Sequence, residues 1–321
     1  MKLKRFDRNP ILLPRGENWE ALAVFNCAAI LIEGKIHVLY RAVGDYVTYS
    51  SRLGYAIFDC NLNLIKRFDK PVFEPDIRFW EMSIEDPRLV RIDNKIYVTY
   101  VTTPTPAPPL AVRLKLGMPK PKQAFPRCAI AEVKDFKEFT RLGTVTPYDA
   151  EERNLVLFPK RIDNKFAALH RPANWIGDKW SVDKPSIWFA WLDKIPDIMY
   201  GHKVVIKPEE DWEMKKIGAG PPPIETERGW ILIYHAVDYN DVYRAGVALL
   251  DLHEPWKLIS KYTKPILEPE KEYEVKGDVP NVVFPTGAIK VNDDLLVFYG
   301  AADKYCCVAF AKLDDIIKCL V

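Results

Sequence analysis

The sequence predicts an all-β protein, a five-bladed β-propeller, from three observations. Apolar strand pairs joined by short polar turns recur five times in the 321 residues, at 28–42, 87–102, 158–172, 222–236 and 286–301. Aligning these hairpins gives one equivalent position at intervals of 60, 70, 64 and 65 residues, occupied by Tyr40, Tyr100, His170, Tyr234 and Tyr299. Further strands follow each hairpin, as in 51–73 and 243–267, and five units of four strands are typical of a propeller.

The two ends of the chain predict how the ring closes. The fifth unit ends one strand short, in CVAFAKLDDIIKCLV, where only a short helix at 313–320 is expected. The N-terminal RNPILLPRGENWE resembles 69–81 and 263–274, which are fourth strands of other units. We therefore expect the N-terminal strand to complete the last blade, so that no sheet edge is left open and 1–321 form a single domain. A β-sandwich, the alternative, does not explain five equal units.

Composition and charge narrow the classes of function. The chain is 48% hydrophobic with a net charge of +2, which argues against a dedicated nucleic-acid binder. The N-terminus shows no signal-peptide pattern, and no run approaches the roughly 18 apolar residues of a membrane span. The six cysteines lack CxxC spacing, so we expect thiols in a cytoplasmic protein rather than disulfides or a metal site.

Polar residues fall where the blades would meet the central channel. The first strand of a blade lies nearest the axis and the second returns to the same face, so residues before first strands and after second strands surround one mouth. Before or within first strands lie Asn26, Glu85, Asp86, Arg88, Arg153, Asn154 and Lys216. After second strands, the equivalent positions are Arg41, Val101, Arg171, His235 and Gly300. The repeat therefore predicts a polar mouth on one face.

Each residue taken alone has a plain structural interpretation. Asp-Pro before a strand is usually a turn, and a lone His170 is more often a satisfied core histidine than a catalyst. Trp175 and Trp180 suit a sugar platform or blade packing equally well. Convergence of many independent positions on one face favours a functional site.

The charges predicted at the mouth indicate its chemistry. A glycosidase needs two carboxylates, one as acid and one as base or nucleophile. Here basic side chains predominate, with Arg52 a further candidate beside Arg41, Arg153, Arg171, Lys216 and His235. Such a set suits a phosphate dianion. If inorganic phosphate is the nucleophile, a single carboxylic acid is enough to protonate the leaving group.

The chain resembles glycoside hydrolase family 130, the inverting β-mannoside phosphorylases, over nearly its whole length. The motifs that carry this resemblance include FNCAA, YRA, SRLGYA, EDPRL, ERNLVLFPK, HRP, KIGAGPPP, YHA, DVPNVVFPTGA and YGAAD. The resemblance implies a five-bladed propeller that needs no cofactor. Its substrates would be a β-mannoside oligosaccharide and inorganic phosphate, its product α-mannose 1-phosphate, and a homo-oligomer is expected.

Roles follow from the resemblance at matching positions. Asp86 would be the catalytic acid, acting through the sugar's 3-hydroxyl. The phosphate-binding residues would be Arg153, Asn154, Arg171, Lys216, His235 and Tyr243. The residues expected to bind or surround the mannoside are Asn26, Arg41, Arg52, Glu85, Arg88, His170 and Asp303. Cys27 stands where the motif usually has a small or polar residue.

Several alternatives stay open at this point. The segment from about 104 to 125 is long and rich in proline where a short connection is expected, and it suits a lid, an acceptor-site wall or a subunit contact. The commoner pattern of the family favours β-1,4-mannooligosaccharides; β-1,2-mannosides and mannosyl-glucose or mannosyl-N-acetylglucosamine are the alternatives. A hydrolytic β-mannosidase is disfavoured by the retained basic residues, and a non-catalytic sugar-binding propeller would need neither acid nor phosphate site.

Overall fold

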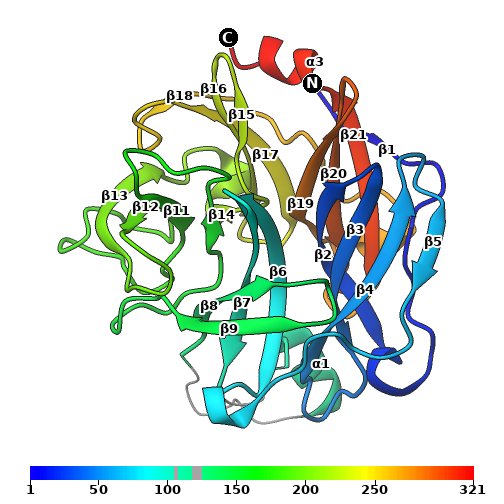
Figure 1. The fold of residues 1–321 in the computed structure, drawn as a ribbon. Coiled ribbons are helices and arrows are strands. Elements are labelled where there is room, and N and C mark those ends of the chain that lie inside the picture. Colours follow the sequence, from blue (N-terminus) through cyan, green and yellow to red (C-terminus); the bar gives the residue numbers. More distant parts are fainter. Residues whose placement is uncertain (105–107, 118–124) are drawn as a thin grey trace.

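The computed structural model describes residues 1–104, 108–117 and 125–321, and its strands form five antiparallel sheets arranged around a central axis (Figure 1). The five-bladed propeller predicted from the sequence is confirmed. In each blade the strand that begins nearest the axis is followed outward by its hairpin partner and two further strands. This order brings the ends of inner and second strands together around the channel.

The strands of each blade follow one another along the chain. The first blade contains β2 (Ala23–Ile32), β3 (Lys35–Val43), β4 (Ser51–Asp59) and β5 (Leu64–Arg67). The second contains β6 (Ser83–Ile92), β7 (Lys95–Thr103), β8 (Arg127–Val133) and β9 (Phe139–Thr144). The third contains β10 (Val156–Leu157), β11 (Phe166–His170), β12 (Ile187–Leu192) and β13 (Tyr200–Ile206). The fourth contains β14 (Lys216–Ala219), β16 (Gly229–Val237), β17 (Tyr243–Leu250) and β18 (Leu258–Lys261), with β15 (Ile224–Thr226) also paired to β16.

The fifth blade joins the two ends of the chain. It contains β19 (Val283–Val291), β20 (Asp294–Ala301) and β21 (Tyr305–Lys312), and β1 (Lys4–Arg5) pairs with β21 as its outermost strand. The NPIL segment continues this contact through a bridge between Leu12 and Cys306. The predicted closure by the N-terminal strand is therefore confirmed, and the edge of β21 is covered.

Helices are few and short. In the ranges that the structure describes, the α-helices are α1 (Leu110–Leu116), α2 (Glu272–Val275) and α3 (Leu313–Lys318), the last of which matches the helix expected near the C-terminus. In Figure 1, α1 lies at the bottom of the view, whereas α3 and both chain ends lie at the top. Within the described ranges no helix has the length and apolar character needed to cross a membrane.

The predicted insertion contributes α1 to the face that carries the mouth. Val112 of α1 is buried in a cluster with Ala23, Phe25, Val43 and Tyr49 of the first blade, although the insertion leaves from the second blade. The other parts of the predicted insertion, 105–107 and 118–124, lie outside the described residues.

The hydrophobic core lies mainly between neighbouring blades. Phe158 and Phe189 of the third blade pack against Trp230 of the fourth, with Phe158 and Trp230 in edge-to-face contact at 5.1 Å between ring centroids. Trp175 is buried and stacks on Trp180 at 4.1 Å, so this pair belongs to the packing of the third blade. Such packing fixes the blades rigidly and so fixes the side chains around the channel.

Candidate active site

Two matching β-bulges direct side chains into the mouth. The pairing register shifts between Phe25 and Ala28 in β2 and between Glu85 and Arg88 in β6, 60 residues further along. Within these bulges Asn26 and Asp86 have φ of 48° and 50°, a left-handed conformation that is uncommon for residues other than glycine. The bulges bring the two side chains together, because Asn26 Nδ2 donates to Asp86 Oδ1 at 2.7 Å.

The Asp86 carboxylate is held between two donors. Arg41 Nη1 donates to the same oxygen at 3.1 Å as Asn26 does, while Arg88 Nη1 donates to the Asp86 backbone carbonyl at 2.7 Å. Burial acts to raise the pKa of Asp86, but the charges of Arg41 and Arg88 and the hydrogen bond from Asn26 outweigh it, and the pKa is lowered. Asp86 is therefore ionised at neutral pH.

Glu85 connects the two parts of the mouth. Its Oε1 lies 3.2 Å from Arg41 Nη2 and its Oε2 accepts from Arg153 Nη1 at 3.2 Å. Ser83 Oγ donates to Oε1 at 3.1 Å, so both oxygens of this buried carboxylate are occupied. Glu85 thus links a carboxylate-rich half around Asp86 to a cationic half around Arg153.

Asp303 completes the carboxylate-rich half. Burial raises its pKa to about 7; Arg41 opposes this shift, while the neighbouring carboxylates Asp86 and Asp278 support it. Asp278 accepts hydrogen bonds from the hydroxyls of Tyr46 at 2.9 Å and Tyr49 at 3.2 Å. This half therefore combines carboxyl groups and hydroxyls, which suits the hydroxyls of a sugar.

The cationic half is built on the third and fourth blades. Arg171, at the end of β11, donates through Nε and Nη2 to Asn154 Oδ1 at 2.9 and 2.6 Å. Burial and the charge of Arg153 lower the pKa of the Arg171 guanidinium, which nonetheless stays protonated. Neighbouring cations that lower one another's pKa mark a place where an anion would be stabilised.

Lys216 and His235 extend this cationic half. Burial, Arg171 and Arg153 lower the pKa of Lys216 to about 7, and its Nζ lies 5.2 Å from the centre of the Tyr243 ring. Burial and the surrounding cations lower the pKa of His235 well below its usual range, so its imidazole is neutral. Among the described residues, His235 Nδ1 is a buried polar atom without a hydrogen-bond partner. A phosphate group would supply both the missing charge and an acceptor.

Glycines in the family-like motifs allow these side chains to approach the backbone. A Cβ on Gly218 would lie 2.6 Å from both Asn154 Oδ1 and His235 Cε1. A Cβ on Gly300 would lie 1.8 Å from Asn26 Oδ1. These two positions therefore require glycine for steric reasons, one in each half of the mouth.

Three residues predicted to bind the mannoside are occupied elsewhere. Arg88 is buried, and besides Asp86 it holds the carbonyl of Gly220 at 3.2 Å. His170 is fully buried inside the third blade, where both ring nitrogens have partners. Arg52 forms an ion pair with Glu74 at 3.0 Å. The geometry supports an indirect role for His170, whose ring nitrogens both have partners, whereas Arg88 keeps one buried nitrogen, Nη2, without a hydrogen-bond partner among the described residues.

Glu152, to which sequence reasoning assigned no role, lies directly beneath the cationic half. Its Oε1 accepts the backbone N–H groups of Arg153, Asn154 and Arg171 at 2.9, 3.0 and 2.9 Å. A signal was present, because a glutamate recurs at intervals of 61, 71, 61 and 61 residues as Glu20, Glu81, Glu152, Glu213 and Glu274. No group of His, Cys, Asp or Glu in the described part of the chain is arranged to hold a metal ion.

Comparisons with known proteins agree with this geometry. A family model described as beta-1,4-mannooligosaccharide phosphorylase matches residues 2–321. The chain is 39% identical to a 1,2-beta-oligomannan phosphorylase and 37% identical to a beta-1,2-mannobiose phosphorylase, both from Thermoanaerobacter sp. (strain X514), over 98% of this chain and 99% of each relative. A solved structure of beta-1,2-mannobiose phosphorylase from Listeria innocua, in complex with beta-1,2-mannobiose, has a similar fold. The TM-score is 0.81 at 23% identity, over 100% of this chain and 99% of that chain.

Proposed function

This chain belongs to glycoside hydrolase family 130, and we propose that it cleaves terminal β-mannosidic bonds of oligomannosides with inorganic phosphate. The observation that carries the proposal is the division of the mouth. Asp86 stands among carboxyl and hydroxyl groups on one side, and on the other the cations Arg171 and Lys216 lie beside the neutral imidazole of His235. That second site fits a phosphate dianion, which brings its own nucleophilic oxygen.

In the proposed reaction, the bond between the mannosyl C1 and the glycosidic oxygen breaks as a phosphate oxygen bonds to C1 from the opposite face. The proton of Asp86 passes to the glycosidic oxygen, which leaves as the hydroxyl of the shortened chain. Inversion gives α-mannose 1-phosphate, and Asp86 regains a proton from solvent. Arg171 and Lys216 orient phosphate and offset its charge, and no cofactor enters these steps.

Because Asp86 is ionised, the mechanism requires that it gain a proton before the bond breaks. An acid must hold its proton when the bond breaks, yet Arg41 and Asn26 favour the carboxylate. A bound phosphate dianion and the exclusion of water both favour the neutral acid, because they add negative charge and lower the local dielectric. We therefore propose that Asp86 becomes protonated in the complex with both substrates.

The linkage that we propose is β-1,2. The commoner pattern of the family favoured β-1,4, and the description of the family model names beta-1,4-mannooligosaccharides. The two relatives described above, at 39% and 37% identity over their whole lengths, are instead named for 1,2-linked substrates. This support favours a β-1,2-oligomannan or β-1,2-mannobiose as substrate, with the mannosyl group transferred to phosphate.

The test is a comparison of β-1,2- and β-1,4-mannobiose and their longer oligomers, each with and without inorganic phosphate, with α-mannose 1-phosphate as the measured product. We expect phosphate-dependent cleavage with the higher kcat/KM on the β-1,2 series. A higher kcat/KM on the β-1,4 series would overturn the linkage but not the reaction. Phosphate-independent release of mannose would identify a hydrolase and overturn the role of the cationic half.

Two further expectations remain predictions. Mannosyl-glucose and mannosyl-N-acetylglucosamine should be poor substrates beside β-1,2-mannobiose, which the same product assay measures. A homo-oligomer is expected, and α1 offers exposed Leu114 and Leu116 on the face of the mouth as a contact. Light scattering of the purified chain would measure its oligomeric state.

A further inference from the structure

Four of the five blades share a buried triad that ties the second strand to the outermost strand. In each, a glutamate before the inner strand accepts the hydroxyl of the aligned tyrosine and also binds a cation from the outermost strand. The triads are Glu20–Tyr40–Arg67, Glu81–Tyr100–Arg141, Glu213–Tyr234–Lys261 and Glu274–Tyr299–Arg5. The tyrosine-to-glutamate distances are 2.9, 2.8, 2.7 and 2.8 Å. Arginine and lysine keep their charge at neutral pH, so these triads have a fixed protonation state.

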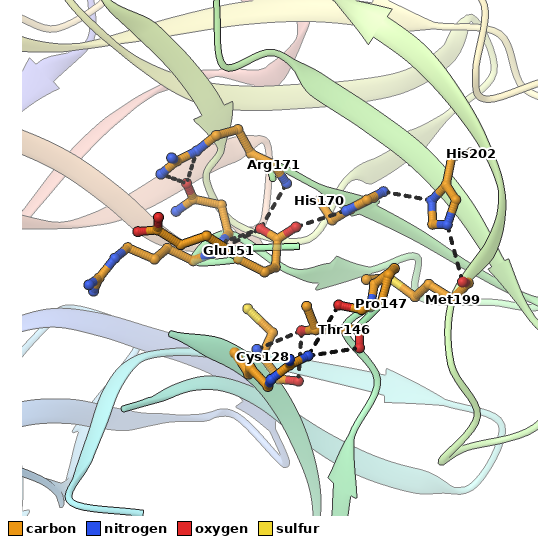
Figure 2. A network of polar contacts seen from close by, with 12 residues as sticks. Cys128, Thr146, Pro147, Glu151, His170, Arg171, Met199 and His202 are labelled. Atoms are coloured by element: carbon orange, nitrogen blue, oxygen red, sulfur yellow. Dashed lines mark hydrogen bonds and ion pairs between the residues drawn. The ribbon is translucent and has the colours of Figure 1, made fainter. Parts of the chain in front are cut away.

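The third blade replaces two members of the triad with histidine. His170 stands at the tyrosine position and His202, on the outermost strand β13, stands at the position of the cation. Glu152 Oε2 lies 2.8 Å from His170 Nδ1, and His170 Nε2 lies 3.1 Å from His202 Nδ1. His202 Nε2 lies 3.1 Å from the Met199 carbonyl oxygen. Figure 2 shows this line of contacts from His170 through His202 to Met199.

Glu152 of the third blade also accepts hydrogen bonds from a different set of backbone N–H groups. In the fourth and fifth blades, Glu213 and Glu274 accept backbone N–H groups from the short turn before the inner strand. Glu152 instead accepts those of Arg153, Asn154 and Arg171, which are all proposed phosphate ligands. The triad that contains two histidines is therefore the one that supports the phosphate site.

The line of hydrogen bonds from Glu152 through His170 and His202 to Met199 requires an extra proton. The contacts Glu152–His170, His170–His202 and His202–Met199 each need one hydrogen, whereas two neutral imidazoles supply one N–H each and a carboxylate and a carbonyl supply none. The third hydrogen must be added to the chain. Burial acts to raise the pKa of Glu152, but its bond to His170 and its backbone donors lower it, while burial and His170 lower the pKa of His202 to about 4. The geometry leaves His170 as the residue that carries the charge.

We propose that His170 is an imidazolium in the phosphate-binding state, and that the Glu152–His170–His202 chain is a positioning device for the phosphate site. The role in phosphate binding rests on the proposed function. With the proton in place, the carboxylate is neutralised within the blade and its Oε1 holds three backbone N–H groups. Without the proton, one of the three contacts is lost and an uncompensated negative charge lies beneath the site that receives an anion.

Other charged and titratable groups face Glu152, His170 and His202 from several elements. Arg171 and Arg153 lie on the side of the phosphate site, and Asp149 acts on His202. Arg88 and Cys128 of the second blade interact with Glu152, and burial raises the pKa of the Cys128 thiol so that it stays neutral. Trp175 lies edge-on to both imidazoles, with centroid distances of 5.7 Å to His170 and 4.8 Å to His202, and shields them.

The first experiment compares phosphate binding by the wild type and by Glu152→Gln. Glutamine can accept the three backbone N–H groups and donate to His170 Nδ1, after which His170 donates to His202 and His202 to Met199. All contacts are then made without the third proton. Dissociation constants for inorganic phosphate are measured by calorimetry from about pH 5 to about pH 9. Lys216 and phosphate titrate in both proteins, so their effects cancel in the ratio of the two constants.

We expect the variant to bind phosphate about as tightly as the wild type at low pH, and more tightly as pH rises and the wild type alone acquires the uncompensated charge of Glu152. The ratio should change by about tenfold across the titration. A ratio that is constant with pH would overturn the proposal. Tyr299→Phe in the fifth blade is the matched control, since it removes one triad contact far from the phosphate site and should keep the wild-type profile.

The second experiment detects the proton directly and does not depend on turnover or on the folding of Glu152→Gln. Nitrogen-15 NMR distinguishes an imidazolium from either neutral tautomer, and the chain has five histidines, with His202→Gln as an assignment variant. We expect His170 to show two protonated nitrogens in the phosphate-bound protein at the low end of the same pH range. A neutral His170 throughout the range would overturn the proposal even if mannoside phosphorolysis is observed. Failure to bind phosphate at all would instead count against the proposed function.

Discussion

The two halves of the mouth carry opposite excesses of charge. Around Asp86, burial raises the pKa of Asp303 to about 7, and the neighbouring carboxylates Asp86 and Asp278 add to this shift. Around Arg171, burial and neighbouring cations lower the pKa of Lys216 to about 7. A carboxyl group and an amine, which ordinarily titrate more than six pH units apart, are thus brought to nearly the same value on two sides of one site.

The opposite charges of the two halves indicate which ligand each half requires. The carboxylate-rich half relieves its excess internally, because Arg41 and Arg153 both contact Glu85 and Arg41 also contacts Asp86. In the part of the chain that the structure describes, no carboxylate is paired with Lys216, whose pKa is lowered mainly by burial and by repulsion from Arg171 and Arg153. A neutral sugar suits the first half, whereas the second is stabilised only when an anion arrives.

Asp86→Asn should give the largest effect and tests the carboxylate-rich half alone. The substitution keeps the size of the side chain and the contact region of Asn26 and Arg41 but removes the transferable proton. We expect kcat for phosphorolysis to fall by about 10²–10⁴-fold, with phosphate dissociation constants changed much less. Thermal unfolding would serve as the control for folding, and normal turnover by a folded variant would show that another group is the acid.

Arg171→Ala should give the next largest effect and tests the cationic half. It removes the guanidinium that is oriented by Asn154. We expect the KM for phosphate to rise by about 10- to 100-fold, as for a lost charge-assisted hydrogen bond, with a smaller change in the KM for the mannoside. Lys215→Met is the matched control, because Lys215 pairs with Asp241 at the surface and should leave both KM values nearly unchanged. Equal increases in both KM values for Arg171→Ala would remove the distinction between the halves.

The pH dependence of stability should show the cost of the buried Lys216 ammonium. Its pKa is 10.5 in the unfolded chain and about 7 in the folded, phosphate-free protein. Between these values the unfolded chain binds the additional proton, so this group makes the free energy of unfolding rise with pH, by at most about 1.4 kcal/mol per pH unit. Below pH about 7 the ammonium is charged in both states and the full cost of burial is present.

Lys216→Met isolates this contribution. Without phosphate, we expect the variant to have a larger free energy of unfolding than the wild type. The difference should be greatest below pH about 7 and should shrink toward pH 10.5. Denaturant unfolding at a series of pH values measures it. A difference that does not vary with pH would mean that Lys216 keeps an ordinary pKa, and the cationic half would then not be strained.

The fold could be predicted from the sequence because its evidence is repeated. Five hairpins with an equivalent aromatic or histidine position indicate the blades, and the shortened last unit indicates closure by the N-terminal strand. The mouth followed from topology, since residues such as Asp86 and Arg171 lie at equivalent ends of strands. The place of β1 in the last blade and the approximate ends of most strands could be predicted from the repeat pattern alone.

The side-chain contacts could not be predicted in the same way. The resemblance placed His170 among the residues around the mannoside, yet the tyrosines at its equivalent position point into their blades toward buried glutamates. The direction of a side chain depends on strand twist and on bulges such as the one at Asp86, which one sequence does not reveal. The recurring glutamates were visible at regular intervals, but their burial and their partners were not.

Arg52→Ala should give the smallest effect and sharpens the boundary of the carboxylate-rich half. The sequence made Arg52 a further candidate for the mouth beside Arg41. In the structure its Nε forms an ion pair with Glu74, whose side chain is 58% exposed. An exposed pair of this kind contributes about 0–1 kcal/mol. We expect kcat/KM for the mannoside to change by less than about threefold, whereas Arg41→Ala should lower it far more, because Arg41 contacts both Asp86 and Glu85. A loss for Arg52→Ala comparable to that for Arg41→Ala would mean that Arg52 leaves Glu74 when the oligosaccharide binds, and that the sugar site reaches the third strand of the first blade.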